Sequence, residues 1–175
     1  MPTPQQVADH LHRFLPAWED ITQEPWILET VQGYRLELER LPDRDISPIT
    51  AVPRDKVKAK EMDMKIVALE AKSTIVQVQA WDDQILSIMF LVPKPAGYRP
   101  VFNVNLLNEN MRKFHFKMEG LHTVCKLLRP GDLMCTVDLK DACFAISITP
   151  ADRRFLWFQW RGSTWEFTCL PFGLT

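Results

Sequence analysis

The chain of 175 residues has 46% hydrophobic and 25% charged side chains, which is typical of a globular protein of one domain, or of one domain with a small lobe. Its formal net charge of −1 argues neither for nor against a nucleic-acid partner. No basic and then apolar leader follows Met1, and no apolar run approaches the roughly 20 residues needed to cross a membrane. We therefore expect an intracellular protein without a membrane-spanning segment.

The charges are unevenly distributed along the chain. Residues 1–50 carry four basic and nine acidic side chains, a net charge of −5, whereas residues 94–130 carry seven basic and two acidic side chains, a net charge of +5. This basic band fits either a solvated surface or an anionic ligand. The cysteines lack CxxC spacing and a histidine cluster, so we expect reduced thiols rather than a zinc site: Cys125, Cys135, Cys143 and Cys169.

The N-terminal third predicts only short elements. Residues 7–15 have a helical pattern that we expect Pro16 to cut. Trp18 and Trp26 flank an acidic turn. Residues 41–55 contain three prolines, which favours an extended connector.

A helix and three strands are expected next. Residues 55–72 predict a helix with this apolar stripe: Val57, Ala59, Met62, Ile66 and Leu69. Residues 74–79 alternate between apolar and polar side chains and predict a strand. Residues 86–92 and 99–105 predict two more strands, and the Pro- and Gly-rich turn between them indicates a hairpin.

The C-terminal part predicts a helix, a strand and a second hairpin. Residues 118–128 have the pattern of an amphipathic helix, and residues 133–137 that of a buried strand, which residues 141–148 follow. Residues 155–160 and 164–169 flank the turn of the second hairpin. We expect its aromatic side chains to form core rather than to stack on bases: Trp157, Phe158, Trp160, Trp165 and Phe167.

An acid ends the predicted strand over residues 133–137. Aspartate at a strand end is commonly a turn residue or a helix N-cap, and Asp141 can support the same helix start as Asp138. A short motif of this kind does not decide its own role. The order of the segments around it therefore matters more.

That order resembles the fingers and the first part of the palm of reverse transcriptases. A hairpin with Lys94 and Arg99 comes first, then a helix with basic flanks, a strand ending in Asp138, and a hairpin leading into LPFGLT. The matching stretches are FLVPKPAGYRPVFNVNLLN (90–108), VDLKDACF (137–144) and FQWRGSTWEFTCLPFGLT (158–175). The sequence is most similar to the DIRS-like group of retrotransposons, through PWILETVQGY (25–34), RPVFNVNLLN (99–108), FKMEGLHTVCKLLRPGD (116–132) and LPFGL (170–174).

The resemblance implies an α+β fold with three parts. Residues 1–54 would be an N-terminal extension and connector, residues 55–132 the fingers, and residues 133–175 the start of the palm with the adjoining fingers hairpin. It also implies RNA-directed DNA polymerisation, with an RNA or DNA template-primer and deoxynucleoside triphosphates as partners. Two Mg²⁺ ions would stabilise the attacking and leaving oxygens.

The resemblance also assigns residues to these ligands. Asp138 would be the first metal ligand, and the backbone carbonyl of Leu139 would add a second. Asp141 and Ala142 would meet the triphosphate through their backbone N–H groups, with Cys143 beside the nucleotide sugar.

Three further residues complete the predicted nucleotide site. Lys94 and Arg99 would contact the triphosphate, although they are equally typical of exposed basic residues beside a turn. Phe172 would lie near the sugar or base, with Gly173 allowing a close backbone approach; an apolar strand end followed by a turn is the alternative.

The sequence also departs from the family pattern. Nothing matches the later hairpin that carries two more aspartates, Cys143 stands where the family usually has an aromatic residue, and the KPAG turn has fewer Lys and Gly residues than usual. We therefore expect a fragment that is inactive alone and whose exposed apolar edges favour self-association. The alternative is a decayed or co-opted, non-catalytic module that binds nucleic acid or protein.

Overall fold

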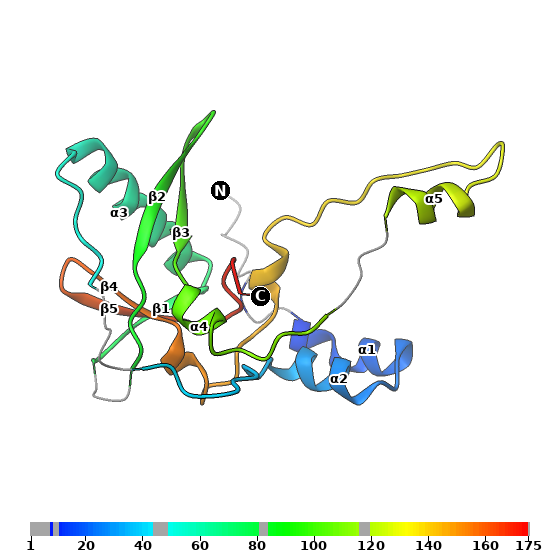
Figure 1. The fold of residues 1–175 in the computed structure, drawn as a ribbon, viewed down its shortest axis with the longest axis horizontal. Coiled ribbons are helices and arrows are strands. Elements are labelled where there is room, and N and C mark those ends of the chain that lie inside the picture. The colour runs from blue at the N-terminus through cyan, green and yellow to red at the C-terminus, as the bar shows by residue number, and fades with distance from the viewer. Residues whose placement is uncertain (1–7, 9–10, 44–48, 81–83, 116–119, 175) are drawn as a thin grey trace.

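The computed structural model describes residues 8, 11–43, 49–80, 84–115 and 120–174. They form a mixed helix-and-sheet fold, which confirms the expected α+β class. Figure 1 shows a packed region, here called the body, from which one long excursion projects. This excursion, residues 120–140, is called the arm.

A three-stranded antiparallel sheet lies at the centre of the body, in the order β1 (Ile75–Val78), β5 (Ser163–Phe167), β4 (Trp157–Trp160). β4 and β5 form the predicted second hairpin. Its turn residues Arg161 and Gly162 both have positive φ angles, 49° and 81°. Such turns match the right-handed twist of the two strands that they join.

The aromatic side chains of this hairpin are buried, which confirms that they form core rather than an exposed stacking surface. Phe158 is fully buried and packs against Phe102 and Phe167 at ring-centroid distances of 6.0 and 5.8 Å. Phe102 comes from the other sheet. The two sheets therefore share one core.

Helix α3 (Lys56–Ala71) covers this core and begins where the sequence predicts it. The carboxylate of Asp55 caps it by accepting a hydrogen bond from the Val57 N–H at 2.8 Å. Four of the five stripe residues are buried: Ala59, Met62, Ile66 and Leu69. The placement of Val57 in that stripe is wrong, because two residues span about 200° of a helix and Val57 faces solvent.

The second sheet is the predicted first hairpin, β2 (Met89–Lys94) with β3 (Gly97–Phe102). Both strands lie closer to the turn than the predicted ranges 86–92 and 99–105. β3 ends early because the Asn103 side chain accepts a hydrogen bond from the Asn105 N–H at 3.1 Å. This turn begins the short helix α4 (Asn105–Asn108).

The N-terminal region forms a 3₁₀ helix and two short α-helices instead of one helix cut by proline; residues 7, 9 and 10 of the predicted helix lie outside the described residues. A 3₁₀ helix, η1 (Leu11–Phe14), leads into α1 (Leu15–Ile21), and α2 (Pro25–Gln32) follows. Pro16 lies in the first turn of α1, where a missing N–H costs nothing, so the expectation that it ends the helix is wrong. Residues 41–43 and 49–55 have no helix or strand, as expected of a connector; residues 44–48 lie outside the described residues.

The arm differs most from expectation. Its helix α5 (Leu121–Leu127) has no buried residue, and residues 118 and 119 of the predicted helix lie outside the described residues. The predicted buried strand over residues 133–137 is wrong: that stretch is irregular, with Leu133 100% and Val137 77% exposed. The apolar pattern was present, but no described strand pairs with it.

Two more 3₁₀ helices connect the arm to β4, namely η2 (Ala142–Ala145) and η3 (Arg153–Phe155). Between them, Ile148 forms a parallel bridge with Tyr34, and Ser147 an antiparallel bridge with Cys169. The bridge to Tyr34 attaches the N-terminal region to the body, and the bridge to Cys169 joins the segment between η2 and η3 to the residues that follow β5. Over the described ranges, no helix combines the length and hydropathy needed to span a membrane.

Candidate functional site

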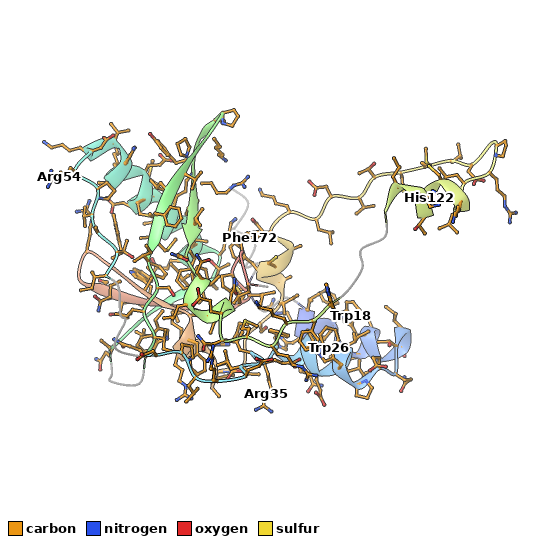
Figure 2. The ribbon with its side chains drawn as sticks, in the orientation of Figure 1. Trp18, Trp26, Arg35, Arg54, His122 and Phe172 are labelled. Carbon is orange, nitrogen blue, oxygen red and sulfur yellow. The ribbon has the colours of Figure 1, made fainter. Side chains whose placement is uncertain are left out.

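The C-terminal segment, residues 170–174, joins two of the predicted site elements. The ring of Phe172 meets that of Phe144 in η2 edge-on, with centroids 5.0 Å apart. The carbonyl oxygen of Gly173 accepts a hydrogen bond from the Asn108 side chain of α4 at 2.7 Å. Figure 2 shows Phe172 between the β2–β3 hairpin and the segment that contains η2. The fold therefore brings η2, which follows Asp141 and contains Ala142 and Cys143, into contact with Phe172 through Phe144.

Gly173 is required by its backbone conformation. Its φ angle is +101°, which L-residues with a side chain rarely adopt. A Cβ atom there would also lie 3.5 Å from the Val104 side chain, so the segment passes close to the end of the hairpin. The sequence prediction of a close backbone approach at Gly173 agrees with this geometry, although the close neighbour is protein. Phe172 itself is more than half exposed.

Asp141 is held in an unusual position at the base of the arm. Its φ angle of 57° is left-handed, and its carboxylate accepts a hydrogen bond from the Lys72 ammonium at 2.6 Å. Aspartate tolerates this conformation better than most residues. Of the residues that follow, Ala142 is exposed, Cys143 is half-buried and Phe144 is buried. The backbone turns sharply into η2 at this point.

Sequence reasoning missed Lys72, because its partner lies 69 residues away in the chain. Lys72 follows α3 at a well-anchored junction. The Thr168 hydroxyl donates to the Ser73 carbonyl at 2.7 Å, and the Thr168 N–H donates to the Thr74 carbonyl at 3.0 Å. The Lys72–Asp141 ion pair therefore connects the base of the arm to both α3 and β5. No local pattern marks a contact of this kind.

The register of the first hairpin places Lys94 and Arg99 on the same face. Arg99 lies opposite Val92, and Lys94 lies two residues beyond Val92 on the same strand. Diagonal neighbours of this kind are roughly 7–8 Å apart. Both cations are exposed, whereas Met89 and Phe102 of the other face are buried in the core.

Two apolar side chains accompany these cations. Phe90 and Val92 belong to the same face of the hairpin and are exposed large hydrophobic residues. The face therefore combines two cations with apolar surface. This combination suits a ligand with phosphates and a flat or apolar part.

Asp138 and Leu139 lie at the end of the arm, just before Asp141, and both are exposed. In the described parts of the chain, no three His, Cys, Asp or Glu side chains gather where they could hold a metal ion. A pair of Mg²⁺ ions requires several carboxylate oxygens. The Asp138 carboxylate and the Leu139 carbonyl can form part of such a centre, but these two groups do not fit a two-ion centre by themselves.

A surface pocket of about 900 Å³ lies elsewhere, between α2 and residues 34–39. None of the predicted site residues lines it. Arg112 of the basic band does, and it is paired with Glu37 at 3.8 Å and lies 5.1 Å from the ring centroid of Phe114. The pocket mixes two arginines with three glutamates, so it has no clear preference for a polyanion.

The cysteines do not form disulfides in the described structure. Burial raises the pKa of the Cys169 thiol to about 12. Cys169 therefore behaves as a small hydrophobic side chain of the core, close to the Thr74 carbonyl.

No protein-family description and no curated protein sequence matches the chain. Solved structures do. The native protease–reverse transcriptase of prototype foamy virus has a TM-score of 0.65 and 20% identity, covering 82% of this chain and 19% of that chain. The foamy viral enzyme in complex with RNA/DNA hybrid has a TM-score of 0.56 and 18% identity, covering 80% of this chain and 19% of that one.

A third structure, the foamy viral protease–reverse transcriptase in complex with dsDNA, has a TM-score of 0.54 and 18% identity and covers 91% of this chain and 33% of that chain. At such low identity the likeness concerns the fold. The chain has a reverse-transcriptase-like fold, and it spans about a fifth of the length of the native foamy virus structure.

Proposed function

We propose that this chain is part of an RNA-directed DNA polymerase from a retrotransposon of the DIRS-like group. The reverse-transcriptase-like fold supports the proposal, as do the sequence motifs in their family order. Residues 1–54 are then an N-terminal extension and connector, residues 55–132 the fingers, and residues 133–175 the start of the palm with the adjoining fingers hairpin. The substrates are a template-primer and deoxynucleoside triphosphates.

The observation that carries the proposal is the shared face of Lys94 and Arg99 on the β2–β3 hairpin. A triphosphate is a polyanion that must be both neutralised and oriented. The planar guanidinium of Arg99 offers paired donors to phosphate oxygens, and the Lys94 ammonium offers a point charge. Because the two side chains are diagonal neighbours, both can reach one triphosphate.

The segment after the arm supplies the second part of the nucleotide site. In this proposal the backbone N–H groups of Asp141 and Ala142 donate to the triphosphate. The Asp141 carboxylate would repel that ligand if it were unpaired. The Lys72 ammonium, 2.6 Å away, neutralises it and holds the turn in place. Lys72 is therefore a positioning residue.

The catalytic metal ions require more than the described residues provide. In the complete enzyme, Asp138 and the Leu139 carbonyl would help to hold Mg²⁺, and the ion would supply stabilisation of the reacting oxygens. The isolated chain holds the ion weakly at best. We therefore expect no primer extension by this chain on an RNA template with Mg²⁺ or Mn²⁺, and robust extension that depends on Asp138 would contradict this expectation.

NMR spectroscopy tests the nucleotide site on the chain as it exists. Titration with dTTP to millimolar concentration should shift the backbone signals of residues 94–99 and 141–142. The Lys94→Glu/Arg99→Glu variant should lose these shifts. The control variant Arg35→Glu/Arg40→Glu reverses two exposed charges outside the basic band and should retain them. Shifts confined to other residues, or unchanged by the first variant, would refute the proposed site.

The small side chain of Cys143 leads us to expect weak discrimination between deoxynucleotides and ribonucleotides. Cys143 is half-buried in η2, beside Phe144, and in the proposed site it lies under the nucleotide sugar. A thiol is smaller than an aromatic ring and leaves room for a 2′-hydroxyl. In a chimaera completed with a related palm and thumb, Cys143→Tyr should raise the deoxynucleotide-to-ribonucleotide ratio of kcat/KM about tenfold or more. An unchanged ratio would show that residue 143 is not at the sugar.

A non-catalytic nucleic-acid- or protein-binding module is the second candidate. The exposed position of Asp138, on an irregular arm where the described residues form no group of three potential metal ligands, favours it. Binding of RNA and DNA should then be tolerant of sequence and weaken steeply with salt. Charge reversal at Arg112 and Lys113 should weaken it further. This second candidate would be favoured if the charge-reversal variant loses nucleic-acid binding and the unmodified chain shows no signal shifts with dTTP.

A further inference from the structure

Helix α3 carries a second apolar face that nothing in the described structure covers. Val57, Met64 and Val67 are 70%, 50% and 62% exposed, and Ala68 and Ala71 are exposed as well. Met64, Val67, Ala68 and Ala71 follow one another at helical spacing, and Val57 lies two turns before Met64, so all five share one stripe along the helix. This stripe lies opposite the buried one that begins at Ala59. A helix that is apolar on two opposite sides is normally buried on both.

Unpaired charges flank one side of this exposed stripe. Lys56, Lys60 and Glu70 are exposed, and among the described residues none of their side chains has an ion-pair partner. By helical geometry Lys56 and Glu70 lie along the same edge of the stripe, and Lys60 lies just inside that edge. Lys56 and Lys60 belong to the first turns and Glu70 to the last, with about 21 Å of helix between Lys56 and Glu70. They therefore cannot pair within one copy.

We propose that α3 is a homodimer surface on which the α3 helix of a second copy packs antiparallel, centred on Met64. Val57 of each copy then lies over Ala71 of the other, and Lys60 lies over Ala68. The two alanines leave room for the larger side chains that oppose them. Helix axes can then approach to the usual distance of about 8–10 Å.

Charge complementarity selects the antiparallel orientation and a second copy as the occupant. In this orientation Glu70 of each copy lies between Lys56 and Lys60 of the other, and the contact forms twice by symmetry. A parallel pair would place lysine beside lysine and lose the contact. Figure 2 shows Arg54 at the outer end of α3, pointing away from the body, so that end of the helix faces solvent.

The interface is small. A helix of 16 residues is about 24 Å long, so a single helix pair is at the low end of specific interfaces. We therefore expect a reversible dimer that forms at micromolar concentrations. The proposal is independent of the proposed function, because α3 carries none of the proposed nucleotide-binding residues.

Sedimentation velocity over about 5 to 500 µM tests the surface. The unmodified chain should change from monomer to dimer, and Met64→Glu/Val67→Glu should weaken association at least about tenfold. The matched control Leu133→Glu/Val137→Glu introduces the same charges on the arm and should associate like the unmodified chain. A monomer throughout, or association lost only in the arm variant, would overturn the proposal. Thermal melts confirm that the variants fold, since all four side chains are exposed.

A charge exchange tests the orientation. Lys56→Glu and Glu70→Lys should each weaken the dimer several-fold, and the double variant should recover part of this loss, because the pair between positions 56 and 70 forms again while Lys60 then faces a lysine. Lys58→Glu reverses a neighbouring charge on the far side of the stripe and should have little effect. Failure of the double variant to recover, or equal weakening by Lys58→Glu, would rule out the antiparallel register.

Discussion

The body and the arm contain similarly apolar stretches with different fates. Residues 155–160 and 133–137 are both rich in large hydrophobic side chains. Phe158 of the first stretch is fully buried, whereas Leu133 of the second is fully exposed. β4 finds its partner β5 across a two-residue turn. The stretch in the arm has no described partner, which shows that a strand depends on its neighbour as much as on its own sequence.

The difference in burial between the body and the arm is tested most directly by truncating one large side chain in each region. Phe158→Ala should lower the free energy of unfolding by about 3–5 kcal/mol, because it removes a ring packed between two others. Leu133→Ala should change it by less than about 0.5 kcal/mol, because that side chain has no burial to lose. Urea denaturation measures both. A similar loss in the two variants would show that the arm packs in solution.

Proteolysis compares how readily the backbone of the arm and that of the body are cleaved. Trypsin should cleave after Lys126 and Lys140 in the arm at least about a hundredfold faster than after Lys65 in α3, because cleavage in α3 requires the body to open. Mass spectrometry of the first fragments in a time course identifies the sites. Equal early cleavage after Lys65 would place α3 among the loosely held parts of the chain.

The ion pair at the junction of the two regions should have a moderate effect. Lys72→Met keeps the apolar stem and removes the charge, and should lower the free energy of unfolding by about 1 kcal/mol because the pair is partly buried. The matched control is Lys65→Met, which loses only the i,i+4 pair with Glu61 and should cost about 0.5 kcal/mol or less. A double-mutant cycle of Lys72→Met with Asp141→Asn should give an interaction free energy that accounts for most of this loss. No coupling would mean that the pair does not fix the base of the arm.

The smallest effect concerns an exposed pair within the body. Arg161 and Trp160 both donate hydrogen bonds to Asp63, which lowers the pKa of that carboxyl below its ordinary value of 3.8. The charged form then stabilises the fold above pH 3.8, and this contribution is lost as the pH falls through the lowered pKa. Asp63→Asn should lower Tm slightly at pH 7, and the difference from the unmodified chain should shrink below pH 3.8. A constant difference from pH 7 to pH 2 would assign the effect to packing instead.

Local patterns were sufficient where the partner of a segment lies nearby in the chain. The two hairpins and helix α3 depend on groups within a few residues of each other, and all three were predicted, although Val57 was assigned to the wrong face of α3. Pro16 was misjudged because proline is tolerated in a first turn and disruptive later. Where the first turn lies was not evident from the sequence.

The candidate site divides in the same way. The sequence motifs identified Lys94, Arg99 and residues 141–143 as candidates, and the hairpin register supports the first two by placing them on one face. The sequence could not identify Lys72, because an ion pair across 69 residues leaves no local trace. Nor could it show that Gly173 passes beside Val104.

The sequence by itself determined the elements whose hydrogen bonds and apolar contacts are local: α3, both hairpins and the aromatic core of the second hairpin. Tertiary structure alone decided which apolar segments become buried. Val57 lies on a helix that the sequence predicts, yet it faces solvent, and residues 133–137 have a strand pattern but no strand. The physical reason is that a side chain is buried only when a second surface packs against it. The pattern of one segment describes its own surface and carries no information about its partner.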